Sequence, residues 1–342
     1  MKGLNNSILY RKIVVIGQGS VVDAFLWSSI KLSLRTFVLI FLLTITLSSR
    51  AEFSNSDYSK VDSLALTIDK TNNLKKLSKR LTEKFSNDDE KYRAIFTWIS
   101  HNISYDCTAL KNRVMRTSDP GKVLKQGKAV CAGYASLFEE LCRLANLECE
   151  TISGWAKTSP LMIGKNLSKN PNHAWNAIKI DNKWYLCDVT WAAGYVSNNS
   201  SIFNFQFKDH YFCVKPELFA SNHFPKKRKW LLGAKMSKNK FVKSPFYYGN
   251  ALKLGIRNPT PNRGVISYIK GKQITIQFDV HKNVEIDELS ISISSDRYSK
   301  PVAFTRSGNT ISFTYQIEKY GRLLIYANND CILVYKMVKN GS

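Results

Sequence analysis

The chain of 342 residues lacks the cysteine spacing from which most zinc sites in proteins are built. Its seven cysteines include no pair of the form Cys-x-x-Cys. Such pairs commonly supply two of the four ligands of a structural zinc ion. We therefore expect no metal site, and we expect catalysis to need neither a metal nor another cofactor.

A complete dinucleotide-binding fingerprint is also missing. Gly17 and Gly19 follow a short apolar run, but Val22 stands where the fingerprint requires its third glycine. That glycine lets the helix pack closely against the strand before it. The sequence therefore does not predict a dinucleotide-binding loop.

Acidic residues are scarce, at 26 against 50 lysines and arginines, which leaves a formal net charge of +24 at pH 7. The basic residues are spread along the chain, with one cluster at residues 226–229. They do not alternate with aromatic residues in a recognisable nucleic-acid-binding module. We therefore expect no nucleic-acid partner. Attraction to an anionic cell envelope, or a generally basic proteome, explains the charge more simply.

The apolar run at residues 36–47 is too short to span a membrane comfortably. Lys31 and Arg35 precede it, and small residues follow it at Ser49 and Ala51. This pattern is typical of a secretory signal that is cleaved after Ala51. Because residues 1–51 make a long leader, either the start codon is assigned too early or the run is an uncleaved anchor. Both interpretations predict that the remainder is exported or faces outward.

The remaining length predicts two domains, because single cores rarely grow beyond about 250 to 300 residues. We place a catalytic core at residues 52–245 and an all-β accessory domain at residues 246–342, with a linker around Pro259 and Pro261. Short segments with alternating apolar and polar residues predict the strands of an immunoglobulin-like sandwich, at residues 273–280, 285–292, 310–317, 322–327 and 331–338. No catalytic constellation occurs in them.

Cys131 stands where a short extended run gives way to a predicted helix. Apolar residues recur after it at helical spacing: Tyr134, Leu137, Phe138, Leu141, Cys142 and Ala145. The positive end of a helix dipole favours a thiolate over a thiol, which lowers the pKa of the cysteine and makes its sulfur a nucleophile. The alternative is a cysteine buried in the core, which is common for free cysteines.

A β-hairpin is predicted around Asp181-Asn182, a pair that tolerates left-handed backbone in a two-residue turn. With this turn, His173 lies opposite Thr190 on the partner strand. His173 and Asp188 are then diagonal neighbours on one face, close enough for a hydrogen bond. A turn of three residues would place them on opposite faces.

Cys131, His173 and Asp188 together have the chemistry that a thiol nucleophile requires. The histidine takes the proton of the thiol, and the aspartate fixes the ring tautomer and supports its positive charge. Each residue has a structural alternative by itself: a strand histidine is often only hydrogen-bonded, and Asp188 can cap a turn. The combination in one geometry favours the catalytic interpretation.

The polar loop at residues 157–172 leads into the histidine strand, and we expect it to form a wall or lid of a substrate groove. Three tryptophans are candidates to line this groove or to fill the core: Trp155, Trp175 and Trp191. The backbone amide of Cys131 is the expected donor to an oxyanion. Gln126 is a second candidate, although a solvent-facing glutamine is the simpler interpretation.

Four motifs resemble the transglutaminase-like superfamily: Val130-Cys131-Ala132-Gly133-Tyr134-Ala135, Ser153-Gly154-Trp155-Ala156-Lys157, His173-Ala174-Trp175-Asn176 and Asp188-Val189-Thr190-Trp191. Flanking segments extend the resemblance over about residues 88–245, and favour the branch of kyphoscoliosis peptidase and cytokinesis protein 3. The resemblance implies an α+β, papain-like core with Cys131 as nucleophile, His173 as base and Asp188 as orienting acid. Ala129 departs from the pattern, because relatives usually carry glycine there.

The predicted activity is acyl transfer from a peptide or protein amide through a thioester. If water accepts the acyl group, the chain is a peptidase or amidase, and if an amine accepts it, the chain cross-links proteins. The nucleophile chemistry is common to both, and the resemblance favours proteolysis. The alternative from another class is a catalytically inactive module that keeps the fold to bind a protein or a cell-wall peptide.

Overall fold

The computed structural model describes residues 57–197 and 201–339. These described residues form one compact unit. The predicted leader, including its apolar run at residues 36–47, lies outside the described residues. In the described part, no helix combines the length and the apolar character needed to cross a membrane.

The larger helices all lie in the N-terminal half of this unit: α2 (Ser59–Leu66), α3 (Leu74–Thr82), α4 (Asp88–Asn102) and α7 (Cys131–Leu144). Asn73 caps α3, because its side chain accepts a hydrogen bond from the amide of Lys76. Helix α4 has three acidic residues in its first turn, where the helix dipole favours negative charge. The chain before residue 85 thus forms two short helices, and the longer helix α4 follows them.

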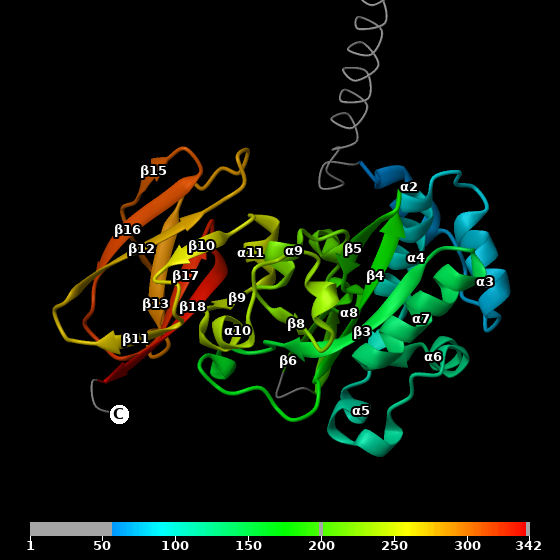
Figure 1. The fold of residues 1–342 in the computed structure, drawn as a ribbon, viewed down its shortest axis with the longest axis horizontal. Helices are drawn as coiled ribbons and strands as arrows, with labels where there is room; N and C mark the ends of the chain where they lie inside the picture. The colour runs from blue at the N-terminus through cyan, green and yellow to red at the C-terminus, as the bar shows by residue number, and fades with distance from the viewer. Residues whose placement is uncertain (1–56, 198–200, 340–342) are drawn as a thin grey trace, which may run out of the picture. The chain divides into compact units, whose positions relative to one another are not determined.

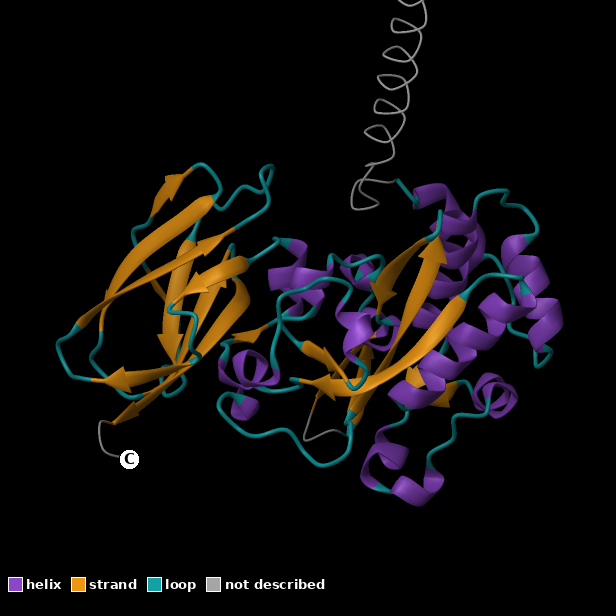
Figure 2. Cartoon of the chain, in the orientation of Figure 1, coloured by secondary structure: helices purple, strands orange, loops and turns teal. Residues whose placement is uncertain are grey.

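An antiparallel sheet with the order β5-β4-β3-β8 packs against α7. Its strands are β3 (Cys149–Ala156), β4 (His173–Ile180), β5 (Lys183–Cys187) and β8 (His223–Pro225). Figure 1 shows α7 lying along β3 and β4, and Figure 2 separates the helices from the strands by colour. Only glycine fits at position 154, since a Cβ atom there would lie 2.3 Å from Cη2 of Trp175 and 2.5 Å from the carbonyl oxygen of Phe224.

The two-residue hairpin turn between β4 and β5 is confirmed. Asp181 and Asn182 have φ values of 48° and 61°, and Ile180 pairs with Lys183. The predicted pairing of His173 with Thr190 is wrong, because β5 ends at Cys187 and helix α8 (Val189–Ala193) follows.

Shorter elements connect these parts. The helical ones are α5 (Cys107–Lys111), η2 (Arg113–Met115), α6 (Pro120–Gln126), η3 (Pro160–Met162), η4 (Asp209–Tyr211), α9 (Pro216–Phe219), η5 (Arg228–Leu231) and α10 (Lys238–Lys243). The strands are β1 (Ser104–Tyr105), β2 (Lys128–Ala129), β6 (Gly194–Ser197) and β7 (Ile202–Phe205). Strand β1 pairs with β2, and β6 with β7, which forms a second hairpin. The first pairing places Tyr105 opposite Ala129, two residues before Cys131.

The C-terminal part is an all-β sandwich, as predicted. One sheet has the order β10-β12-β16-β15 and the other the order β11-β18-β17-β13-β14, with β9 on β18. The elements are β9 (Phe246–Tyr247), α11 (Gly249–Lys253), β10 (Arg257–Thr260), β11 (Val265–Tyr268), β12 (Gln273–Asp279), β13 (Leu289–Ile293), β14 (Lys300–Pro301), β15 (Thr305–Ser307), β16 (Thr310–Gln316), β17 (Gly321–Ala327) and β18 (Asp330–Lys339). Alternate residues such as Phe278, Phe313 and Ile325 share one buried cluster, which joins the two sheets.

The linker predicted around Pro259 and Pro261 is wrong. Pro259 lies in β10, which forms the edge of its sheet. Proline is tolerated there because an edge strand need not donate its amide on the outer side. The chain enters this sandwich earlier, at residues 246 and 247, which pair with β18.

Candidate active site

Cys131 is the first residue of α7, as the sequence predicts. Val130 before it is extended, and the amides of Gly133 and Tyr134 bond to its carbonyl oxygen to start the helix. Position 133 has no space for a side chain, because a Cβ atom there would lie 2.6 Å from Cβ of Ala129. The buried face of α7 packs against the sheet. The half-buried sulfur of Cys131 is therefore held at the N-terminus of α7, which is the positive end of the helix dipole.

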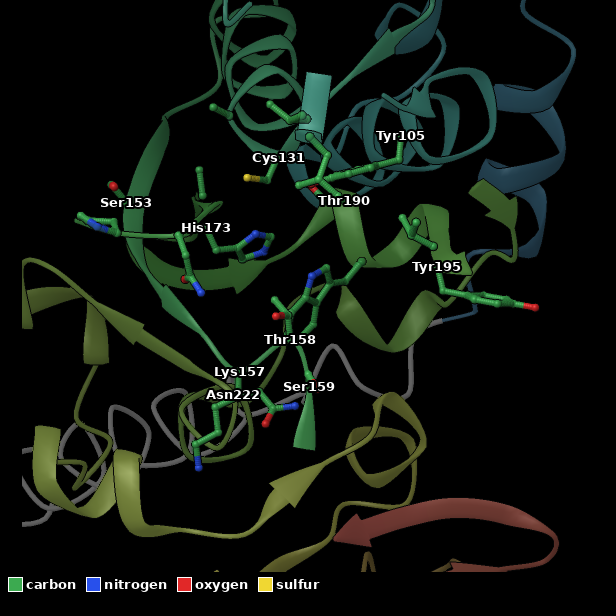
Figure 3. Close-up of a pocket in the computed structure, with 18 of the residues that line it drawn as sticks. Tyr105, Cys131, Ser153, Lys157, Thr158, Ser159, His173, Thr190, Tyr195 and Asn222 are labelled. Atoms are coloured by element: carbon green, nitrogen blue, oxygen red, sulfur yellow. The ribbon is translucent and has the colours of Figure 1, made fainter. Parts of the chain in front are cut away.

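The pKa of Cys131 is lowered from its ordinary value. Burial of the sulfur would raise this pKa, but a hydrogen bond from His173, the charge of that ring and the backbone amide of Ala174 together outweigh the burial. Figure 3 shows the sulfur and the imidazole ring in the same part of the pocket. A thiolate paired with an imidazolium is therefore the favoured state of these two groups.

His173 is the first residue of β4, and its Nε2 atom lies 2.6 Å from Oδ2 of Asp188. Burial would lower the pKa of this histidine, but the charge and hydrogen bond of Asp188 raise it well above its ordinary value. Burial would raise the pKa of Asp188, but the charge and hydrogen bond of His173 hold it well below the usual range. The carboxylate thus stays ionised and supports a protonated ring.

Asp188 also ends the hairpin, and its second oxygen has a structural role. Oδ1 accepts hydrogen bonds from the amides of Thr190 at 2.9 Å and Trp191 at 3.0 Å, which caps α8. The structural alternative, a capping aspartate, therefore holds together with the proposed catalytic contact. Each oxygen of the carboxylate serves one of the two purposes.

His223 is a neighbour of Asp188 that the sequence reasoning did not assign to the site. Its Nε2 atom lies 3.1 Å from Oδ2, the oxygen that also faces His173. Its ring stacks on Phe219 at 3.9 Å between centroids and meets Trp191 at 4.4 Å. It lies 35 residues beyond Asp188 in the chain, so no local spacing could have indicated this contact.

The ligand atoms of His173, Asp188 and His223 lie within 4.8 Å of one another, a spacing that a divalent ion could bridge. The same atoms are, however, already joined by hydrogen bonds of 2.6 and 3.1 Å. Oδ1 of Asp188 is held by two amides. Hydrogen bonds within the protein thus already satisfy these atoms, in a cluster with Asp188 between the two histidines.

A cavity of about 1240 Å³ opens over Cys131 and His173. Residues 157–159 and 168–172 line part of it, so the loop before the histidine strand is a wall of the cavity, as predicted. Residues 194–196 of strand β6 and residues 246–249 also line it. The volume is sufficient for a peptide segment of several residues.

The tryptophan and glutamine candidates are placed differently from one another. Trp191 lines the cavity, whereas Trp175 is buried against Phe219 and His223. Trp155 is not among the residues that line the cavity, and its Nε1 atom donates to the carbonyl oxygen of Ser168, which is. Gln126 is exposed at the last turn of α6 and is also absent from that lining.

Two hydroxyl groups near Cys131 were not indicated by the sequence. Burial and then the charge of Cys131 raise the pKa of Tyr105, so its phenol stays protonated as a donor. Oγ1 of Thr190 is buried and has no hydrogen-bond partner within the described residues. Both residues line the cavity, as Figure 3 shows, and both are candidates to donate to a bound oxyanion.

Comparison with known proteins agrees with these features. Residues 75–189 match the model of the family described as "Transglutaminase-like superfamily". The chain is 33% identical to kyphoscoliosis peptidase of Mus musculus over 222 residues, which are 64% of this chain and 34% of that protein. It is 32% identical to cytokinesis protein 3 of Schizosaccharomyces pombe over 39% of this chain and 15% of that protein.

A third relative is Hillarin of Drosophila melanogaster, at 23% identity over 62% of this chain and 27% of that protein. The chain thus spans about a third or less of the length of these relatives. The matched segment contains Cys131, His173 and Asp188, and ends one residue after the aspartate. Residues 75–189 of this chain therefore belong to a domain of the transglutaminase-like superfamily.

Proposed function

We propose that this chain catalyses acyl transfer on peptide or protein amides through a thioester on Cys131, with water as the acceptor. The observation that carries the proposal is the lowered pKa of Cys131 beside His173, whose ring is held by Asp188 at 2.6 Å. A nucleophile, a base and an orienting acid then act in series at the wall of one cavity.

The proposed reaction starts from the thiolate of Cys131 and the protonated ring of His173. The sulfur attacks the amide carbon, and the carbonyl oxygen becomes an oxyanion for which Tyr105, Thr190 and the amide of Cys131 are the available donors. His173 gives its proton to the leaving nitrogen, the carbon–nitrogen bond breaks, and a thioester remains. The ring then takes a proton from water, the hydroxide attacks the thioester, and the thiolate leaves with the acid released.

The choice of water as the acceptor is supported by the named activity of one relative, kyphoscoliosis peptidase. Cross-linking by an amine acceptor uses the same thioester and is the alternative activity. A catalytically inactive binding module is the alternative of another class. Hydrolysis predicts a free acid as product, cross-linking predicts an amide of the acceptor amine, and an inactive module predicts no product.

The test combines a thiol-directed probe with a peptide library. We expect the wild type to be labelled at neutral pH, Cys131→Ala to lose this labelling, and His173→Ala to lose most of it. Cys107→Ala is the matched control, because Cys107 is also half-buried but burial raises its pKa. Equal labelling of wild type and His173→Ala would favour the inactive module.

The acceptor is identified by mass spectrometry of library products with and without a primary amine. Free acids in both samples would show hydrolysis. Amides of the added amine would show transfer. Unchanged peptides, with labelling of Cys131 intact, would contradict both activities.

We further propose that the catalytic part is exported, from the signal pattern at residues 36–47. The measurement is fractionation of cells that express the full chain, with protease added to intact cells. Recovery of the chain only with soluble cytosolic markers, after the periplasmic and surface fractions have been separated, would contradict export.

A further inference from the structure

Apart from the thiolate of Cys131, the charged side chains that line the cavity are all basic. Among the described residues that line it there is no aspartate or glutamate, whereas five lysines and arginines are present: Arg113, Arg116, Lys157, Lys169 and Lys208. They come from three separate parts of the chain, residues 113–116, residues 157–169 and residue 208. Positive charge therefore surrounds the site from several segments, and no single basic run explains it.

None of these five side chains forms an ion pair with a carboxylate within the described part of the chain. Some basic groups elsewhere in the described part do form such pairs, as in Arg93 with Asp62 at 2.7 Å and Lys179 with Glu148 at 2.8 Å. At the cavity, neutral groups take their place. Nε and Nη2 of Arg116 donate to the carbonyl oxygens of Ala109 and Leu110.

Lys157 is the most buried of the five. Its Nζ atom donates to the carbonyl oxygen and Oγ of Ser244, both at 2.8 Å, and to the carbonyl oxygen of Pro245 at 3.3 Å. Its Nζ atom is therefore engaged inside the protein. Burial lowers the pKa of Lys157 to about 7, so it carries only part of a positive charge at neutral pH and makes no direct contact with a ligand. Arg113 and Lys169 are exposed and Lys208 is half-buried, so these three remain for contact with a ligand. Arg116 is also exposed, but its Nε and Nη2 atoms already donate to backbone carbonyl oxygens.

A cavity with walls of low dielectric and charge of one sign concentrates ligands of the opposite charge. Arginine adds a planar fork that matches the two oxygens of a carboxylate. We propose that the substrate of this site is a peptide with carboxylate groups next to the amide that Cys131 attacks. The inference rests on the proposed function and names the substrate class for it.

The carboxylate can come from glutamate and aspartate side chains or from a free C-terminus. The test therefore compares peptide pairs that differ only as Glu and Gln beside the reactive amide, and pairs that differ only as free and amidated C-termini. We expect kcat/KM about tenfold higher for the charged member of at least one pair, since a hydrogen bond to a charged group is worth at least this factor. Equal values for both pairs would overturn the inference.

Variants locate the effect. Arg113→Gln combined with Lys169→Gln is expected to bring the ratio between charged and neutral peptides close to one. Lys122→Gln combined with Lys125→Gln is the matched control: it removes the same charge from exposed positions on α6 that do not line the cavity. A ratio lowered equally by both pairs would show only the general charge of the chain and would overturn the inference.

Failure of the proposed function can be recognised separately. The binding of the same peptides to Cys131→Ala is measured by calorimetry, which needs no turnover. A preference for the charged peptides without turnover by the wild type would contradict the proposed function but support this inference. Turnover by the wild type without any preference for the charged peptides would support the proposed function but contradict this inference.

Discussion

His173 and Asp188 lie 15 residues apart in the sequence, and their side chains meet at 2.6 Å. A two-residue turn fixes the register of β4 and β5, and the chain leaves β5 just before the aspartate. Because Asp188 caps α8 with its other oxygen, its side chain has little freedom to turn away from the ring. The same helix start thus fixes both the local fold and the orientation of the acid.

Asp188→Asn should separate these two roles. The amide oxygen of asparagine can still cap α8, so the change at the helix cap should alter the free energy of unfolding by less than about 1 kcal/mol. Without its negative charge the protonated ring of His173 loses support, and kcat/KM should fall about 10³-fold to 10⁴-fold. Asp188→Ala removes the cap as well and should be less stable by about a further 1 kcal/mol. Activity retained in Asp188→Asn would contradict the role of the charge.

The pH dependence of alkylation should report the pair of Cys131 and His173. The pKa of Cys131 is lowered and that of His173 is raised, so the ion pair exists between these two values. Alkylation should therefore rise at a lower pH than in a free thiol, and kcat/KM should fall on the alkaline side as His173 loses its proton.

His173→Ala should move the alkylation curve of Cys131 to a higher pH, because burial then acts on the thiol without compensation. Alkylation rates are measured with a small neutral reagent between pH 4 and 10. His101→Ala is the control, since His101 bonds to the carbonyl oxygen of Thr97 in α4 and takes no part in the pair. An identical curve in His173→Ala and wild type would contradict the pairing.

The parts of the fold that could be predicted depend on local patterns. The short turn at Asp181-Asn182 permits a single register, and the apolar face of α7 is long enough to identify a helix. Strands β12, β16 and β18 alternate clearly and were predicted close to their observed bounds. Short edge strands such as β14 and β15 bury little, so their sequences carry no comparable pattern.

The candidate site was predictable only in part, for a related reason. Helix α8 replaces a predicted strand because the capping bonds of Asp188 outweigh the strand propensity of Val189 and Thr190. Tryptophan suits a core and a groove equally well, so Trp175 and Trp191 could not be distinguished before their contacts were known. Tyr105 and His223 reach the site through long-range pairing, which no sequence spacing reveals.

His223 should act as a positioning residue through Asp188. His223→Phe keeps the packing on Phe219 and Trp191 but removes the donor to Oδ2. Asp188 then becomes a stronger acceptor for His173, so the pKa of His173 should rise and that of Cys131 should fall further.

In His223→Phe, the acidic limb of the pH profile of kcat/KM should therefore move to lower pH and the alkaline limb to higher pH. The value of kcat/KM should fall because Asp188 is held less firmly. His223→Gln restores a donor near the position of Nε2 and should move both limbs back toward the wild type. The groups that face this cluster are Asp188, His173 and, through the carboxylate, Tyr211. Loss of activity in both variants without a shift of either limb would show that His223 only supports packing.

The close approach at Gly154 should make this position of β3 intolerant of any side chain. A Cβ atom there would overlap Trp175 and the backbone of Phe224, the neighbours that hold β4 and β8 beside the site. Gly154→Ala should therefore lower the free energy of unfolding by about 1 to 3 kcal/mol, as overpacking of a core usually does.

Gly121→Ala is the matched control, because a Cβ atom there meets only Oδ1 of Asp119 at 3.4 Å. Its position within α6 favours alanine over glycine by up to about 1 kcal/mol. Urea denaturation of the two variants should thus give changes of opposite sign. Equal stability of Gly154→Ala and the wild type would mean that Trp175 can move aside, and the ring beside His173 and His223 would then be less firmly packed than the structure shows.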